Sequence, residues 1–132
     1  MSNEKKLIEL AYGAANNAYA PYSGFCVGAA LECEDGTVYT GHNIENASFG
    51  ACMCAERVAL YNAFGGKVKP IKRMAVVNSK GGLTPPCGLC RQVLSEFVDE
   101  DFEIIMEDED GPVVKRFDEI MPYSFKLEVE HE

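Results

Sequence analysis

The chain has 132 residues, of which 47% are hydrophobic and 25% charged, and these values are typical of one globular domain rather than of a disordered segment. Its 21 acidic residues outnumber its 12 Lys and Arg residues, which makes the formal net charge −9. A chain this acidic lacks the overall positive charge that is typical of proteins that hold a phosphate backbone, so we expect no nucleic-acid partner.

The sequence contains no apolar run of the length found in signal peptides or membrane-spanning helices. We therefore expect no membrane association and a cytoplasmic location. In a reducing compartment the six cysteines are more often free, metal-bound or catalytic than paired in disulfides. No linker or repeat interrupts the sequence, so we expect residues 1–132 to form a single domain.

The first half of the chain predicts a helix, a hairpin and a second helix, in that order. Apolar residues recur at helical spacing within residues 4–20, and Pro21 stops this pattern. Two apolar or β-branched runs, residues 25–33 and 37–44, flank the turn sequence EDG and predict a β-hairpin. We expect the second helix to run from about residue 54 to 64.

The second half begins with the most apolar strand candidate, residues 71–79, which we expect at the centre of the sheet. A third helix is predicted over residues 87–98. Residues 102–107 and 112–117 flank the turn sequence DEDG and predict a second hairpin. This order of elements predicts an α/β fold, in which helices pack against the faces of one mixed sheet.

Three cysteines lie where the second and third helices are predicted to begin. Cys87 and Cys90 are three residues apart, so both thiols can bind one ion, and Cys54 precedes the second helix. The partial positive charge of a helix N-terminus lowers a thiol pKa and favours metal binding. On these residues alone, a redox pair, ordinary core cysteines and a closed zinc site that includes Cys52 all stay open.

Glu56 favours an open metal site over a closed one. A closed four-thiolate site has no use for a carboxylate at its edge, whereas an open fourth position holds a water that needs a base beside it. Because Cys54 and Glu56 are two residues apart, both can reach one ion only if that ion lies beyond the end of the helix.

The motif Cys54-Ala55-Glu56, followed by PCGLC at residues 86–90, matches the zinc deaminase signature in its all-cysteine form. With the flanking sequences NIENASFGACMCAER and PCGLCRQVLSE, the chain resembles the small homotetrameric cytidine deaminases of pyrimidine salvage over nearly its whole length. The resemblance implies a three-layer α-β-α fold, with a mixed five-stranded sheet whose last two strands are antiparallel. It also implies a hydrolase that converts cytidine and 2′-deoxycytidine to uridine and 2′-deoxyuridine and releases ammonia.

The resemblance assigns roles in the chemistry to five residues. Cys54, Cys87 and Cys90 would bind one Zn²⁺ per subunit, with water as the fourth ligand. Glu56 would carry protons between this water, the pyrimidine ring and the leaving amino group. Arg57 would donate hydrogen bonds to the thiolates and offset part of their negative charge.

The resemblance also implies contacts to a nucleoside substrate. Asn43 and Glu45 match residues that hydrogen-bond the ribose 3′-hydroxyl. Ala55 would supply backbone hydrogen bonds to the pyrimidine. Phe25, which by residue type alone we would expect in the core, would pack near the base.

Two further aromatic residues match positions that reach a neighbouring subunit. Phe49 and Phe125 would each complete another subunit's active site, so the sites of a homotetramer would be shared across its interfaces. Phe49 stands where many members of the family have tyrosine. The phenolic hydrogen bond near the 5′-hydroxyl is therefore absent here.

Three alternative functions are weighed against this one. A deaminase that acts on bases inside RNA or DNA shares the zinc chemistry, but the negative net charge opposes it. The short turn DEDG opposes it too, because it makes the last two strands an antiparallel hairpin, whereas the polynucleotide-editing relatives place a helix between the corresponding strands. A blasticidin-type deaminase shares the pattern PCGxCRQVL, but NIENAS with CAER is more similar to the nucleoside group. The third is a non-catalytic binding module stabilised by a closed four-cysteine zinc site.

Overall fold

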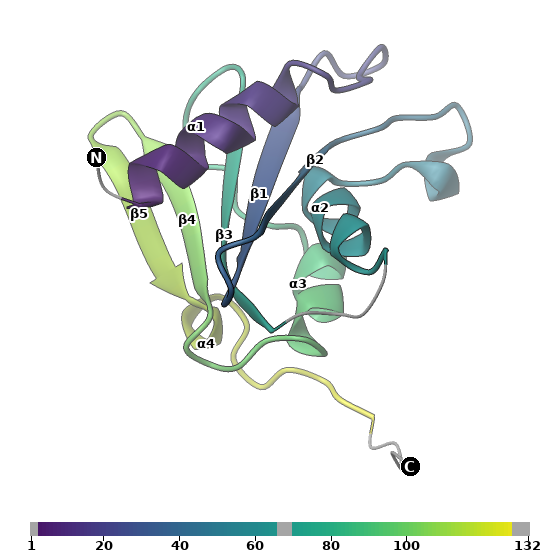
Figure 1. Cartoon of the computed structure of the whole chain (residues 1–132). Helices are drawn as coiled ribbons and strands as arrows, with labels where there is room; N and C mark the ends of the chain where they lie inside the picture. The colour runs from purple at the N-terminus through teal and green to yellow at the C-terminus, as the bar shows by residue number, and fades with distance from the viewer. Residues whose placement is uncertain (1–2, 66–69, 128–132) are drawn as a thin grey trace.

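One mixed five-stranded sheet organises the chain, as shown by a computed structural model that describes residues 3–65 and 70–127 (Figure 1). The strand order is β2-β1-β3-β4-β5, in which β3 and β4 are parallel and the other neighbours are antiparallel. The strands are β1 (Val27–Cys33), β2 (Val38–His42), β3 (Ile71–Asn78), β4 (Glu103–Asp108) and β5 (Gly111–Arg116). Both predicted hairpins and the central position of β3 are confirmed.

Helices cover both faces of this sheet and produce three layers (Figure 1). The helices are α1 (Asn3–Ala15), α2 (Ala55–Ala63), α3 (Gly88–Ser95) and the short α4 (Phe117–Ile120), with a 3₁₀ turn, η1 (Phe49–Ala51). On one face α1 buries Leu7 and Ile8 against Ala75 of β3. On the other face Leu60 of α2 and Leu94 of α3 pack in the larger apolar cluster. The predicted three-layer α-β-α fold is confirmed.

Two helices are shorter than the apolar spacing predicted. The first ends at Ala15 because the chain beyond it pairs elsewhere: Tyr19 N–H donates to the Asn43 carbonyl at 3.0 Å, and Glu45 N–H donates to the Tyr19 carbonyl at 2.8 Å. The third helix ends at Ser95 rather than at residue 98. Its apolar pattern also included Leu89, which is 65% exposed and so does not belong to the core.

Two strand glycines allow α1 and α2 to approach the sheet closely. A Cβ atom at Gly28 of β1 would lie 1.9 Å from the Ala11 carbonyl oxygen of α1, and one at Gly41 of β2 would lie 2.3 Å from the Ala59 nitrogen of α2. Since these contacts are with backbone atoms, side-chain rotation cannot relieve them. Gly41 thereby sets how closely the first turns of α2 pack on the sheet.

We expect Gly28→Ala to destabilise the fold by about 3 kcal/mol or more, because the helix must move away from the strand. Gly13→Ala is the matched control, since a Cβ at this exposed position of α1 meets nothing within 4 Å. It should stabilise the fold by about 0.5–1 kcal/mol, because alanine is the better helix former. Urea unfolding of both variants measures the difference, and equal stabilities would contradict the packing argument.

No helix within the two described ranges, 3–65 and 70–127, has both the length and the apolar character needed to cross a membrane.

Candidate active site and metal centre

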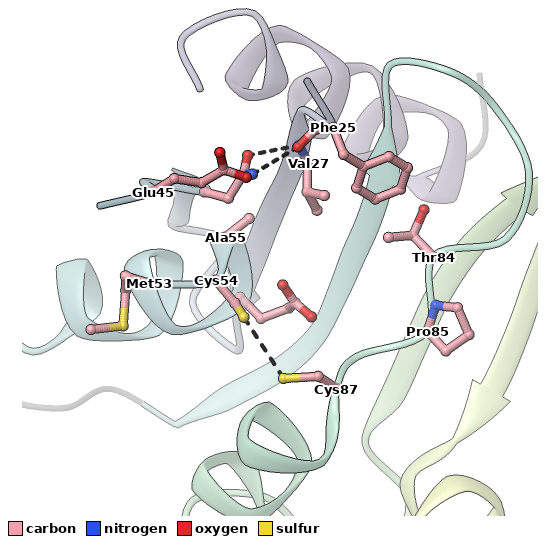
Figure 2. A pocket seen from close by; sticks show the side chains of 11 residues that line it. Phe25, Val27, Glu45, Met53, Cys54, Ala55, Thr84, Pro85 and Cys87 are labelled. Carbon is pink, nitrogen blue, oxygen red and sulfur yellow. Dashed lines mark hydrogen bonds between the residues drawn. The ribbon is translucent and has the colours of Figure 1, made fainter. Parts of the chain in front are cut away.

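The N-termini of α2 and α3 meet at a group of three thiols. Cys54 is the residue that caps α2, Cys87 caps α3, and their sulfur atoms lie 3.7 Å apart (Figure 2). The sulfur atom of Cys90, one turn further along α3, completes a group whose members all lie within 4.8 Å of one another. Tetrahedral zinc with Zn–S bonds of about 2.3 Å requires sulfur atoms about 3.8 Å apart, so the spacing suits one zinc ion.

Cys52 does not belong to this group among the residues that the structure describes. Its sulfur atom instead accepts a hydrogen bond from the Asn46 N–H at 3.2 Å, and its thiol lies 3.4 Å from the Asn46 carbonyl oxygen. These contacts close the loop that carries Phe49. The arrangement therefore favours three thiolate ligands over the closed four-thiolate alternative.

Charge and hydrogen bonds around the thiols favour a thiolate. The Cys90 thiol and the Arg57 guanidinium, whose Nη2 lies 3.5 Å from the Cys54 sulfur atom, lower the pKa of Cys54 to about 5. The pKa of Cys90 is raised because its proton is held by Cys54 and because the side chain is buried. Arg57 Nε is buried without a hydrogen-bond partner among the described residues, so a second donor stands beside this group of sulfur atoms.

Glu56 lies in the first turn of α2 and is only 4% exposed. Burial raises the pKa of its carboxyl group to about 7. A group with a pKa near neutrality can both accept and release a proton under physiological conditions. Glu56 shares a cavity with two of the clustered thiols, which places an acid–base group beside the metal-binding atoms.

This cavity has a volume of about 280 Å³ and lies between the start of α2, the loop before α3 and the segment before β1 (Figure 2). It brings together seven of the predicted site residues: Phe25, Asn43, Glu45, Cys54, Ala55, Glu56 and Cys87. Phe25 is 39% exposed, so the expectation from residue type that it belongs to the core is wrong. The remaining lining residues, Val27, Met53, Thr84 and Pro85, were not predicted as site residues.

Phe49 and Phe125 do not line the cavity; they are 82% and 63% exposed. In a single chain neither aromatic ring is covered. This placement is compatible with the expectation that both rings reach another subunit.

Two polar side chains that sequence reasoning missed hold the loop before α3. Arg91 Nε donates to the Pro86 carbonyl at 2.8 Å, and Arg91 Nη1 donates to the Ile120 carbonyl at 2.6 Å. Buried Asn78, at the end of β3, donates through Nδ2 to Thr84 Oγ1 at 2.6 Å. The one sequence signal for Asn78 was an amide at the end of an otherwise apolar strand.

Residues 1–106 match the family model described as "Cytidine and deoxycytidylate deaminase zinc-binding region". The chain belongs to this deaminase family. It is 40% identical over 127 residues to the cytidine deaminase of Halalkalibacterium halodurans, and the match covers 96% of each chain. It is also 43% identical over 109 residues to the cytidine deaminase of Sporosarcina psychrophila, with 83% of this chain and 80% of that one covered.

The fold of this deaminase-family chain agrees with that of solved family members. It matches the crystal structure of the cytidine deaminase from Burkholderia pseudomallei with a TM-score of 0.86 and 41% identity, covering 95% of this chain and 100% of that one. The resemblance inferred from the sequence is confirmed. A zinc-binding family region, together with three thiols spaced for one ion, identifies zinc as the metal cofactor.

Proposed function

We propose that this chain is a hydrolase that deaminates cytidine and 2′-deoxycytidine to uridine and 2′-deoxyuridine, with release of ammonia, as a step of pyrimidine salvage. The observation that carries the proposal is a buried carboxyl group, Glu56, in one cavity with the thiols of Cys54 and Cys87. The relatives named cytidine deaminase at 40% and 43% identity support it.

In this proposal Cys54, Cys87 and Cys90 hold one zinc ion per subunit. When bound, zinc supplies a Lewis acid with an open coordination position at which water is activated as a nucleophile. Glu56 accepts a proton as water adds to C4 of the pyrimidine and transfers a proton to N3. It then carries the proton of the new C4 hydroxyl group to the amino group. The C4–N bond breaks as the C4 carbonyl forms, and ammonia leaves, so water and cytidine account for all the atoms of uridine and ammonia.

The nucleoside would be held by groups that keep unused hydrogen-bonding capacity. Ala55 occupies the first turn of α2, where backbone N–H groups lack intrahelical partners and can donate to the pyrimidine. Asn43 uses Oδ1 to accept from Val27 N–H at 2.9 Å and one Nδ2 proton to donate to the Phe25 carbonyl at 2.8 Å. Its second Nδ2 proton, with the acceptor oxygens of Glu45, suits a hydroxyl group that both accepts and donates.

Arg57 would reduce the negative charge that three thiolates place on the metal. We expect Arg57→Ala to lower zinc affinity or kcat by about 10- to 100-fold, as is typical for a residue that hydrogen-bonds a metal ligand. Arg57→Lys keeps the charge and should lose less. Competition with a zinc chelator, run beside the activity assay, measures both effects; unchanged affinity and kcat in Arg57→Ala would show that Arg57 does not serve the thiolates.

We also propose that the chain assembles as a homotetramer whose active sites are completed across interfaces by Phe49 and Phe125. Their exposure, together with that of Tyr22, Leu89 and Leu127, leaves large apolar side chains on the described surface for subunit contacts. Light scattering should give four times the chain mass of 14.5 kDa. A monomer at the assay concentration would overturn this assembly.

A cytoplasmic location is likewise a proposal. It is supported by the free thiols of Cys26, Cys52, Cys54, Cys87 and Cys90, which are typical of a reducing compartment. The organisation of residues 1–132 as a single domain stays a prediction from the sequence.

The proposed activity is tested by an absorbance assay of zinc-loaded protein with cytidine, 2′-deoxycytidine, cytosine and blasticidin S. We expect turnover of both nucleosides and much less of free cytosine, because the ribose contacts are then lost. Zinc is measured on the same sample. No turnover of either nucleoside by protein that contains one zinc ion per chain would overturn the proposal.

A further inference from the structure

The segment between α1 and β1 brings Phe25 to the rim of the cavity (Figure 2). Two side chains from the segment that follows β2, Asn43 and Glu45, hold it there. Asn43 bonds the backbone of Phe25 and Val27, as described above. The Glu45 carboxylate bonds the preceding part of the segment: Oε1 accepts from Tyr22 N–H at 3.0 Å and from Ser23 N–H at 3.1 Å. The two residues proposed to bind ribose therefore also shape the rim.

The hydroxyl group of Ser23 links these contacts. Ser23 Oγ donates its proton to Glu45 Oε2 and accepts a hydrogen bond from the Phe25 N–H at 3.0 Å. Both oxygens of the Glu45 carboxylate are consequently bonded, one to backbone N–H groups and the other to a hydroxyl. A half-exposed glutamate side chain otherwise rotates freely, so these bonds select one orientation.

The same bond also affects the charge of Glu45. The Ser23 hydroxyl is the main cause of a lowered pKa for Glu45, and the Tyr22 and Ser23 N–H groups lower the pKa further. An ionised carboxylate only accepts hydrogen bonds, and its two oxygens offer about four acceptor positions. Three are engaged here, which leaves room to accept from a substrate hydroxyl.

We infer that Ser23 is a positioning residue for sugar recognition: its hydroxyl orients the Glu45 carboxylate to accept a hydrogen bond from the 3′-hydroxyl of a nucleoside. This inference rests on the proposed nucleoside deaminase function. Ser23 acts through Glu45 and does not touch the reacting atoms. Orientation before binding lowers the entropy lost when the nucleoside enters, so Ser23 contributes to affinity for sugars that carry the 3′-hydroxyl.

The test compares two nucleosides that differ only at the 3′-position, 2′-deoxyuridine and 2′,3′-dideoxyuridine, as competitive inhibitors of cytidine turnover by the zinc-loaded protein. Ser23→Ala should raise the inhibition constant of 2′-deoxyuridine by about 2- to 10-fold, the size expected when the Glu45 side chain has to be ordered only on binding. The inhibition constant of 2′,3′-dideoxyuridine should stay within about twofold. Ser23→Thr, which keeps the hydroxyl, should restore the wild-type value.

A second comparison tests the route through Glu45. In a Glu45→Ala background, Ser23→Ala should cause no further change, because the residue through which it acts is gone. Equal losses for both inhibitors, no loss for either, or additive losses in the double variant would overturn the inference and leave the proposed function intact. Absence of cytidine turnover by the wild-type protein would instead overturn the proposed function, and the inference with it.

Discussion

Glu56→Gln is expected to lower kcat for cytidine by about 10²- to 10⁴-fold and to leave zinc bound, because an amide of nearly the same shape cannot carry protons. Glu56 is 4% exposed, so a larger change of side chain would risk a cavity or a clash. Its carboxyl group does not belong to the group of three thiols that could hold the metal ion. The variant thus separates proton transfer from metal binding.

The absorbance assay and a zinc determination on the same samples measure this effect. Glu9→Gln, on the exposed side of α1 and far from the cavity, is the matched control and should behave as the wild-type chain. A Glu56→Gln variant that keeps more than about a tenth of the wild-type kcat would remove Glu56 from the proposed proton path, since such groups contribute at least about 10²-fold.

Cys87→Ser is expected to reduce bound zinc to a small fraction of one ion per chain and to abolish activity with it, because a neutral hydroxyl is a far weaker zinc ligand than a thiolate. Cys87 is exposed and caps α3, where serine is among the preferred residues. The substitution therefore creates no buried cavity and keeps the start of the helix. A loss of zinc then reports the ligand itself rather than damage to the fold.

Cys52→Ser is the control for this variant, since it removes a partly exposed thiol two residues from Cys54 that bonds Asn46 instead of the other thiols. It should keep both zinc and activity. Release of zinc by Cys52→Ser would show that four thiolates close the site and that the open-site interpretation is wrong. Zinc retained at full occupancy by Cys87→Ser would exclude Cys87 as a ligand.

The elements were predictable where local chemistry determines them. The turn sequences EDG and DEDG correctly placed both hairpins, and the apolar run at residues 71–79 correctly placed the central strand. The helix ends were less predictable. Residues beyond Ala15 continue an apolar helical pattern, but the backbone of Tyr19 hydrogen-bonds to Asn43 and Glu45, and that competition depends on a distant segment.

In the candidate site, too, local sequence predicted some features, while others depend on distant segments. Spacing along the chain placed Cys54 and Cys87 at helix starts, and the adjacent Glu56 indicated an open site. Phe25 shows the limit of residue type, because a phenylalanine beside a strand is usually buried, whereas here it lines the rim of the cavity.

The sequence by itself determined the two halves of the deaminase signature and the order of the elements, because each half and each element depends on neighbours a few residues apart. Only the tertiary structure decided that the sulfur atoms of Cys54 and Cys87, 33 residues apart in the sequence, lie 3.7 Å from one another. It also decided that Ser23 bonds Glu45 and that Arg91 links the loop before α3 to α4. Such contacts form when the sheet and its helices pack. No local pattern encodes them, because each depends on how two distant segments are brought together.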